Sequence, residues 1–545
     1  MSFFSSFFVA LLVCMLLVPL LMRYADALGL TDETNDRKVH DGVVPRCGGI
    51  AIVAGFVASM TLFWPDSQLK IMIVVGALII ALFGFLDDRS DLDYRWKFFG
   101  QIIASVLVVA AGLRIDVWPF VGIDAVSIYL SAPVTVIFLI GVTNAMNLSD
   151  GLDGLAAGAS LITLAALAWL FWLAGNTVMV TFSMAAIGSV CGFLRFNNHP
   201  AVVFMGDTGS QFLGFITGCL AVYLCQRTDV ALNPALLLLL VGLPILDTLS
   251  VMLWRIRTGR SPFSPDRNHF HHRLLDFGLL HYEAVSAIYV AQIFLVSLAV
   301  GIRYQGDFLV VGLYVLFALL VVGFFRWGRI RNFQIRASVE GQGFVERRNN
   351  WLRRFPGLPG FMVRITELLA AGFLIFAAIY SKYVPEQLGI GAAVMAALAM
   401  AAGVTPQPWR NNLFRVVIYI TGIAAVYSLL GQPRFELLQN WHINAYMIGL
   451  GLCLVFSIRL TRREVFQTTP LDILIVTFVL AIVVASTLTE RSDFSTQLAD
   501  TAIRLAVFFY VSEYLSSRGQ GALKLLPMAA MGALTILAAR GLMAG

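Results

Sequence analysis

The chain has 545 residues, of which 59% are hydrophobic and only 13% are charged, and its formal net charge is +6. A soluble protein of this length needs more charged surface, so the composition excludes an ordinary soluble enzyme and indicates an all-α, polytopic membrane protein. The basic residues lie mainly in short loops between apolar runs, which argues against a nucleic-acid-binding protein.

Eleven apolar runs come before a long basic segment, and each is expected to cross the membrane as a helix. Their approximate ranges are 3–22, 49–64, 70–86, 98–114, 131–147, 154–174, 177–195, 208–225, 232–254, 282–301 and 307–326. The first run lacks the basic start and the cleavage site of a signal peptide, so it is expected to be retained. Most loop Lys and Arg follow odd-numbered runs, which predicts that these loops face the cytoplasm and that the N-terminus lies outside.

The segment that follows the eleventh run is rich in arginine and contains two prolines. We expect three parts: a membrane module at residues 1–326, a basic cytoplasmic linker at 327–364, and a C-terminal membrane module at 365–545. The C-terminal module holds about seven further apolar runs, and the sequence indicates no function for it.

Acidic residues stand at the ends of four different apolar runs, on the side predicted to be cytoplasmic. They are Asp87 and Asp88, Asp150 and Asp153, Asp207, and Asp266. A charged group at a bilayer centre costs about 2.5–3.5 kcal/mol on insertion scales, so acids this close to hydrocarbon indicate a function. Their common side predicts one shared site for a metal ion and phosphates.

In the string NAMNLSDGLDGLAAG, polar residues recur every three positions: Asn144, Asn147, Asp150 and Asp153. This spacing approximates one helix face, although the glycine after each acid favours a broken helix or a loop. Glycine also lets the backbone approach a phosphate closely. Carboxylate and amide oxygens are the ligands that Mg²⁺ prefers, so the string predicts a metal or phosphate site.

Three of these acidic motifs also have a structural alternative. Asp87 and Asp88, followed by Arg89, could form a solvated helix cap. The NAMNLSDGLDGLAAG string could be a turn closed by Asn and Asp side chains. Asp207, in FMGDTGS, could be the N-cap of the eighth span, and only its shared side with the other acids favours a metal ligand.

Three of the chain's seven histidines lie beside two arginines in the string DRNHFHHRL: His269, His271, His272, Arg267 and Arg273. Their spacing does not match that of a structural zinc site, although zinc remains an alternative. Histidines and arginines on a cytoplasmic loop fit an anionic ligand better, through charge and hydrogen bonds. The isolated histidines His199, His281 and His442 are expected to be incidental.

Together the strings DDRSDLDYRWKFFGQ, NAMNLSDGLDGLAAG, FMGDTGS and DRNHFHHRL, in this order, resemble the polyprenyl-phosphate N-acetylhexosamine-1-phosphate transferase family. Members of that bacterial family transfer a sugar-1-phosphate from a UDP-sugar to undecaprenyl phosphate and release UMP. The resemblance runs from the N-terminus to about residue 326. The histidine string is similar to that of the branch that starts O-antigen, common-antigen or teichoic-acid linkage chains, which includes lipopolysaccharide biosynthesis.

The resemblance implies a Mg²⁺-dependent enzyme of the bacterial inner membrane, with Mn²⁺ as a substitute and with its active site facing the cytoplasm. It implies that Asp207 and Asn147 hold the metal ion, and that Asp87 or Asp88 assists deprotonation or positioning of the acceptor phosphate. It further implies that Lys38 approaches the uridine and that Asp150 and Asp153 line the nucleotide pocket. Asn144 and Lys97 are also predicted to bind substrate. The residues predicted to hold the donor diphosphate or sugar are Arg267, His269, His271 and His272.

Two other classes of membrane protein use intramembrane acids: ion-coupled transporters and aspartyl proteases. A transporter site normally lies near the midplane, often between related halves, whereas these acids stand at helix ends and the halves show no repeat. The expected partners are a UDP-N-acetylhexosamine, undecaprenyl phosphate and membrane lipids, with a homodimer left open. The sequence leaves open which sugar is used and whether transfer takes one step or passes through a covalent carboxylate intermediate.

Overall fold

The computed structural model describes residues 2–32, 44–63, 67–121, 126–228, 232–261, 268–334, 357–381, 384–404, 409–429, 440–460, 493–516 and 525–543, with a few positions between 472 and 479. Eleven of the described helices are long and apolar enough to cross a membrane. The prediction of an all-α, polytopic membrane protein is therefore confirmed. The chain divides into two compact units, residues 1–338 with 469–471 and residues 339–468 with 472–545.

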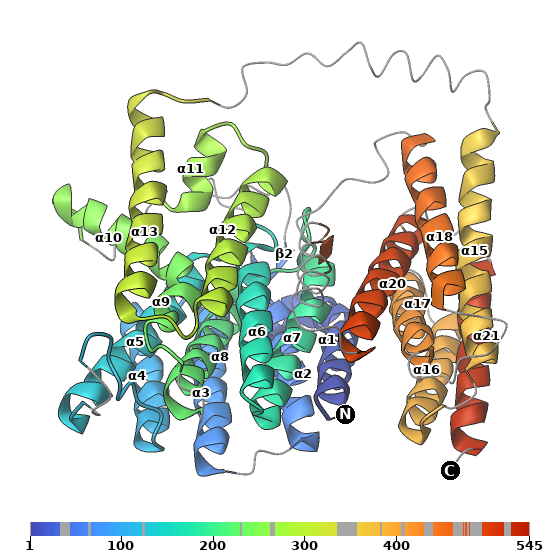
Figure 1. The fold of residues 1–545 in the computed structure, drawn as a ribbon, viewed down its shortest axis with the longest axis horizontal. Helices are drawn as coiled ribbons and strands as arrows, with labels where there is room; N and C mark the ends of the chain where they lie inside the picture. Colours follow the sequence, from blue (N-terminus) through green and yellow to red (C-terminus); the bar gives the residue numbers. More distant parts are fainter. Residues whose placement is uncertain are drawn as a thin grey trace. The chain divides into compact units, whose positions relative to one another are not determined.

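The long helices of the first unit run roughly side by side, and the short ones lie among or beside them (Figure 1). They are α1 (Ser2–Leu28), α2 (Gly48–Leu62), α3 (Gln68–Ser90), α4 (Tyr94–Ala110), α5 (Ile128–Leu148), α6 (Leu155–Leu173), α7 (Thr177–Asn197), α8 (Gly206–Arg227), α9 (Leu236–Leu240), α10 (Gly242–Arg257), α11 (Phe270–Asp276), α12 (His281–Gly301) and α13 (Asp307–Ile330). A two-residue antiparallel ladder pairs β1 (Thr31–Asp32) with β2 (Val44–Pro45).

Helix α8 forms the core of this unit, where it packs against α2, α3, α5 and α6. Glycines let two of these neighbours come close to its first turn. A Cβ atom on Gly49 of α2 would lie 2.3 Å from the Gly209 nitrogen, and one on Gly84 of α3 would lie 2.7 Å from the Thr208 nitrogen. Because neither glycine position has room for a side chain, α2 and the end of α3 both lie directly against the start of α8. This packing joins two acidic motifs that are far apart in the sequence.

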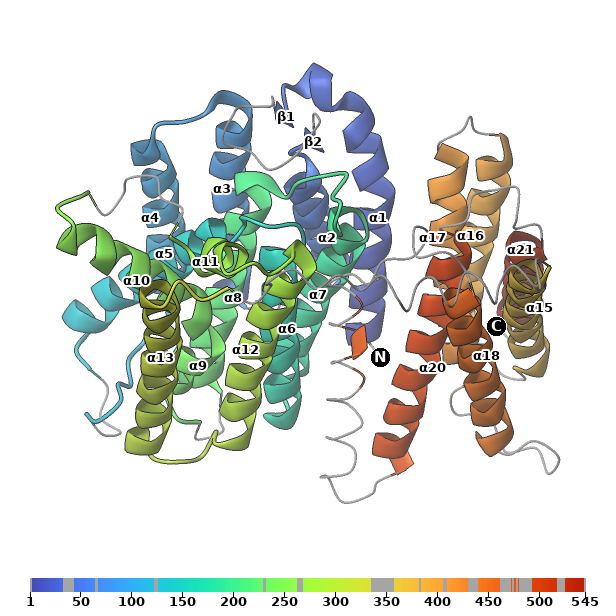
Figure 2. The same ribbon diagram turned by 90° about the horizontal axis from the view of Figure 1, so that it is seen from above.

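The ninth predicted span, residues 232–254, is not one continuous helix in the structure. Helix α9 ends at Leu240 and α10 begins at Gly242. Pro244 has no N–H to donate to the Leu240 carbonyl, which an uninterrupted helix would require. Instead the Gln292 Nε2 and Thr163 Oγ1 atoms donate to that carbonyl, at 3.0 and 3.2 Å. After the break, α10 projects from the side of the unit (Figures 1 and 2).

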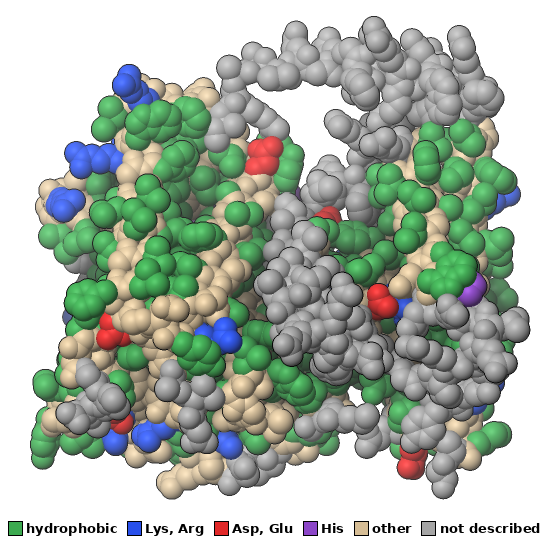
Figure 3. All heavy atoms as spheres, viewed as in Figure 1, with side chains coloured by type: hydrophobic (Ala, Val, Ile, Leu, Met, Phe, Trp, Pro, Cys, Tyr) green, Lys and Arg blue, Asp and Glu red, His purple; other side chains and the backbone are tan. Residues whose placement is uncertain are grey.

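Hydrophobic side chains cover most of the face formed by α12 and α13, and charged side chains lie mainly toward the helix ends (Figure 3). Phe308, Leu319 and Leu320 of α13 are among the most exposed of these apolar residues. An apolar face of this kind costs free energy in water and is suited to contact with lipid tails.

The second unit is also helical in its described part. Its helices are α15 (Leu358–Tyr380), α16 (Glu386–Val404), α17 (Trp409–Ser428), α18 (Asn440–Leu460), α20 (Asp493–Ser516) and α21 (Leu525–Met543). The buried Arg504 side chain donates to Asn444 Oδ1 at 2.9 and 3.0 Å, and buried Glu367 accepts from the first N–H groups of α21. Each of these buried charges therefore has a partner, and the contacts join α20 to α18 and α15 to α21. One of the seven apolar runs expected in the C-terminal module, near residues 471–488, lies almost wholly outside the described residues.

Candidate active site

Asp88, at the end of α3, binds the N-terminus of α8. Its Oδ1 accepts a hydrogen bond from the Asp207 backbone N–H at 2.8 Å, and its Oδ2 accepts from the Thr208 N–H and hydroxyl at 2.9 and 2.6 Å. A carboxylate is favoured at a helix N-terminus by the free N–H groups and the helix dipole. Gly206 has a φ of +66°, and a Cβ atom there would lie 2.5 Å from the Asp88 carboxylate, which explains this glycine of the FMGDTGS motif.

Asp87 shares a cation with Asp207. The Lys97 Nζ atom, from α4, lies 2.5 Å from Asp87 Oδ2 and 2.9 Å from Asp207 Oδ2. The other oxygen of Asp87 accepts from the Leu92 N–H at 2.8 Å, and Gln211 Nε2 donates to Asp207 Oδ2 at 2.9 Å. The adjacent acids Asp87 and Asp88 therefore have different surroundings: one faces a cation, and the other holds a helix end.

Asn144 is part of an amide network inside the unit. Its Nδ2 donates to Gln101 Oε1 at 2.6 Å, and Gln101 Nε2 lies 3.0 Å from Gln211 Oε1. These contacts link α4, α5 and α8, which indicates that Asn144 positions these helices. Its contact with the substrate remains a prediction. The side chain of Asn147, one turn further, lies within hydrogen-bonding reach of Asp207.

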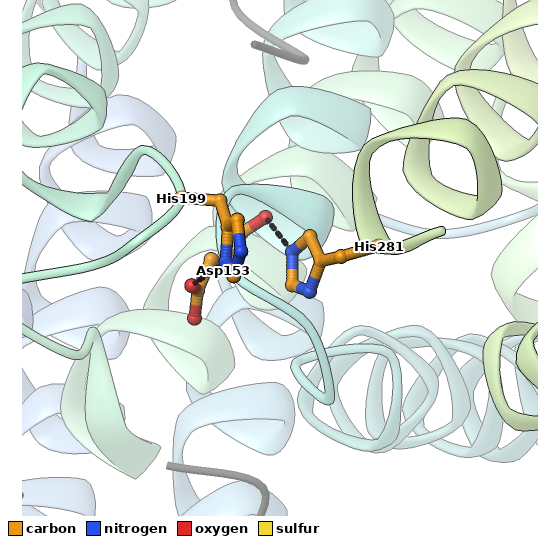
Figure 4. Close-up of side chains that lie close together, drawn as sticks. All are labelled: Asp153, His199 and His281. Carbon is orange, nitrogen blue, oxygen red and sulfur yellow. Dashed lines mark hydrogen bonds and ion pairs between the residues drawn. The ribbon is translucent and has the colours of Figure 1, made fainter. Parts of the chain in front are cut away.

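The loop between α5 and α6 brings two more acids to this region. Asp150 is part-buried and its side chain makes no hydrogen bond within the part of the chain that the structure describes. Burial, followed by the charges of Asp207, Asp88 and Asp153, raises the pKa of Asp150 to about 7. Asp153 is buried, and its Oδ2 atom lies 2.7 Å from His199 Nδ1 (Figure 4). The Ala201 N–H also donates to this oxygen, at 3.1 Å.

The histidine string contacts this loop. His271 is buried, and a Cβ atom on Gly151 would lie 2.2 Å from its Nε2 atom, so only glycine leaves room for the imidazole. Burial, with the nearby His272, His269 and His281, lowers the pKa of His271 to about 3. Its ring is therefore neutral near pH 7, and its buried Nε2 atom has no hydrogen-bond partner within the described chain. An unsatisfied buried nitrogen is costly, which suggests that it meets a ligand.

Asp247, which the sequence reasoning did not single out, orients the neighbouring His269. The His269 Nδ1 atom lies 3.0 Å from Asp247 Oδ2, and the Phe270 N–H donates to Asp247 Oδ1 at 2.9 Å. Both side chains of the pair are buried. The available signal was an acid inside an apolar run, LPILDTLSV, because a charge there needs a partner or a function.

The residues present fit a Mg²⁺ ion. The predicted ligands Asp207 and Asn147 supply carboxylate and amide oxygens, which are the donors that Mg²⁺ prefers, and the Asp87 carboxylate lies beside Asp207. The Lys97 ammonium between two of these carboxylates shows that a cation is stabilised at this position. Asp150 adds a further carboxylate near Asp207, so the carboxylates outnumber the Lys97 ammonium. A divalent ion would reduce the repulsion between them.

Of the predicted site residues, the structure gathers most of those it describes at one end of the first unit. Asp87, Lys97 and Asp207 are in contact, and Asp150 interacts with Asp207 through its charge. His271 lies against the loop that holds Asp150. Lys38, Asp266 and Arg267 lie outside the described residues. The catalytic, substrate-binding and metal-binding roles remain predictions.

The fold and site define a class: an integral membrane protein of α-helices with a carboxylate-rich cluster at the ends of its spans. The family model described as glycosyl transferase family 4 matches residues 70–225, which run from the first turn of α3 into the last turn of α8. The chain belongs to this family, as the resemblance of its four strings predicts.

Several bacterial relatives are similar along most of their own length. A Bacillus subtilis protein named as a probable undecaprenyl-phosphate N-acetylglucosaminyl 1-phosphate transferase is 36% identical over 320 residues, which are 58% of this chain and 88% of that protein. A decaprenyl-phosphate N-acetylglucosaminephosphotransferase of Mycolicibacterium smegmatis is 36% identical over 48% of this chain and 72% of its own. The undecaprenyl-phosphate alpha-N-acetylglucosaminyl 1-phosphate transferase of Escherichia coli is 28% identical over 62% of this chain and 91% of its own.

Proposed function

We propose that this protein transfers N-acetylhexosamine-1-phosphate from a UDP-sugar to undecaprenyl phosphate. In this reaction an oxygen of the lipid phosphate forms a bond to the phosphorus that carries the sugar. The bond from that phosphorus to the bridging oxygen breaks, UMP leaves, and a diphosphate-linked lipid remains. The observation that carries the proposal is the cluster of Asp87, Lys97 and Asp207, in which two helix ends surround one cation. The names of the relatives support a polyprenyl-phosphate acceptor and N-acetylglucosamine as the sugar.

Two anionic substrates must meet at one phosphorus, so the site has to offset their repulsion. Lys97 is a fixed cation that phosphate oxygens can approach. Asp207 and Asn147 would hold Mg²⁺, with Mn²⁺ as a substitute, and the bound ion would neutralise phosphate charge. Asp87 is the better of the two adjacent acids to receive a proton or position the acceptor, because it faces the Lys97 ammonium, whereas the oxygens of Asp88 hold the first turn of α8.

The donor would occupy the region between the α5–α6 loop and the histidine string. Gly151 permits close approach of backbone and ligand, and neutral His271 beside it offers a nitrogen without a partner in the described chain. Asp247 holds His269 in one orientation, which reduces the entropy that binding a diphosphate would otherwise cost. Lys38 and Arg267 are proposed to supply positive charge to the nucleotide and the diphosphate, respectively.

The acceptor would arrive from the bilayer and the nucleotide donor from the cytoplasm. We therefore place the protein in the bacterial inner membrane, with the cluster on the cytoplasmic side and the N-terminus outside, as the basic loops favour. The lipid product would initiate a cell-envelope polysaccharide of the O-antigen or lipopolysaccharide type. An ion-coupled carrier is less well supported, because Asp87, Asp88 and Asp207 lie at helix ends and not in mid-span.

The direct test is UMP release by the purified full-length chain in detergent, with Mg²⁺, UDP-N-acetylglucosamine and undecaprenyl phosphate. We expect UMP and the diphosphate lipid in equal amounts, and neither when the lipid acceptor or the metal is omitted. UDP-N-acetylgalactosamine and UDP-glucose, offered separately, would identify the sugar. An exposed acid in the α3–α4 loop supplies a matched control, since Asp91→Asn should remain active. A folded wild-type protein without acceptor-dependent UMP release would refute the proposal.

A further inference from the structure

Three metal-ligating side chains come together from segments that are distant in the sequence. Asp153 lies in the loop before α6, His199 lies between α7 and α8, and His281 is the first residue of α12. One ligand atom from each lies within 4.8 Å of the other two, and Figure 4 shows the three groups side by side. We propose that they form a binding site for a divalent transition-metal ion such as Zn²⁺, separate from the predicted Mg²⁺ ligands Asp207 and Asn147.

Asp153 holds the two histidines near one another. Its Oδ2 atom lies 2.7 Å from His199 Nδ1, and its backbone carbonyl lies 3.3 Å from His281 Nε2. The two imidazole rings stack, with centroids 4.0 Å apart and planes inclined by 16°. The Ala201 N–H, at 3.1 Å from Oδ2, further fixes the carboxylate. Because the hydrogen bonds converge on Asp153 and the two rings already touch, the donor groups are gathered before an ion arrives.

Burial and exposure are arranged so that an ion can reach a buried carboxylate. The Asp153 side chain is 1% exposed, whereas the His199 side chain is 36% exposed. A buried carboxylate is costly unless a positive charge or hydrogen bonds offset it, and a divalent ion would do so strongly. An ion could therefore enter beside His199 and bind where the potential is negative.

The donor set selects the kind of ion. Two imidazole nitrogens and one carboxylate oxygen are a ligand set that zinc accepts with a fourth position left for water. Mg²⁺ prefers an all-oxygen, octahedral shell, so it suits Asp207 and Asn147 better than this site. Zinc bonds of about 2 Å in a tetrahedron place ligand atoms roughly 3.3 Å apart. To hold an ion, the hydrogen-bonded pair of Asp153 Oδ2 and His199 Nδ1, now 2.7 Å apart, would have to open slightly, and the other spacings, all within 4.8 Å, would have to adjust. Rotation of the His199 and His281 side chains can supply both changes.

A bound ion would tie together the loop before α6, the connection from α7 to α8, and the first turn of α12. Hydrogen bonds and ring stacking already join these segments. The ion would therefore stabilise the end of the unit that also holds Asp150.

The test uses Co²⁺ as a spectroscopic probe for the zinc position in the metal-free, full-length protein. Tetrahedral Co²⁺ absorbs visible light, and Zn²⁺ should displace it with a stoichiometry of one ion per chain. His199→Asn and His281→Asn should each weaken binding by at least about 10-fold, the loss found when even a residue outside the ligand shell is removed. His442→Asn, the same change in the second unit, should leave binding unchanged. His199→Cys should keep Zn²⁺ binding, because a thiolate replaces the imidazole as ligand.

Three results would overturn the proposal: no Co²⁺ or Zn²⁺ bound by the wild type, equal binding by the His199→Asn variant, or loss of the signal only in His271→Asn. The last result would place the ion on the histidine string. Should His281→Asn fail to elute as a single species, the exposed His199 variants still decide the question. None of these measurements uses UMP release, so their outcome is independent of the proposed transferase activity.

Discussion

Replacing Asp88 with asparagine should separate a positioning role from a chemical one. The carboxylate accepts three hydrogen bonds from the first turn of α8, two on Oδ2 and one on Oδ1. The asparagine amide has nearly the same shape, but it has one oxygen only. If that oxygen keeps the two bonds from Thr208, the NH₂ group faces the Asp207 N–H, and two donors oppose each other.

The magnitude follows from these bonds. A hydrogen bond to a charged group contributes about 1.5–3 kcal/mol, and a negative charge at a helix N-terminus adds about 0.3–1 kcal/mol. Asp88→Asn should therefore weaken the hold on α8 by about 2–4 kcal/mol, which corresponds to roughly 30-fold or more in the population of correctly placed Asp207. We expect a loss of this size in the kcat for UMP release and a lower unfolding temperature in detergent.

A double-mutant cycle with Thr208→Ala tests the mechanism of that loss. The Thr208 hydroxyl donates to Asp88 at 2.6 Å, so its removal should cost less in the Asp88→Asn background than in the wild type. We expect a coupling energy of about 0.5–3 kcal/mol, with Asp91→Asn as the inert control. If Asp88→Asn kept wild-type kcat, or if the two changes were strictly additive, Asp88 would not act through the N-terminus of α8.

Asp207→Asn should abolish turnover without affecting membrane insertion, because it removes a charge from the predicted Mg²⁺ site; near-normal UMP release by the purified variant would exclude this ligand. Asp247→Asn should lower kcat by about 10-fold through loss of a charge-assisted bond, and should have little further effect in a His269→Asn background; additive losses would contradict the pairing. The raised pKa of Asp150, about 7 against an ordinary value of about 4, means that the folded protein retains a proton that the unfolded chain releases. Stability should therefore decrease as pH rises from about 4 to 7, and thermal unfolding of Asp150→Asn should show a smaller decrease; an unchanged slope would mean that another group is responsible. A chain ending near residue 336 should insert and release UMP, since every described candidate residue lies in the first unit; a folded but inactive truncated protein would show that the second unit is required.

The sequence by itself determined the class of protein and the places where chemistry is expected. Hydrophobic runs predict spans directly, because the cost of burying a charge in lipid acts on each segment separately. The acids Asp87, Asp150 and Asp207 were recognisable for the same reason, as charges that stand next to apolar runs. The order of four motif strings was sufficient to predict the family.

Only the tertiary structure decided which of these side chains meet. Asp87 and Asp88 are neighbours in the chain, yet close glycine packing of α3 on α8 gives one a helix end and the other Lys97. The pairing of His269 with Asp247 likewise joins two segments that share no local pattern. Local sequence patterns report burial and periodicity, whereas these contacts depend on which helix faces which. That choice is made by close packing across the whole unit, so it becomes visible only when the helices are assembled.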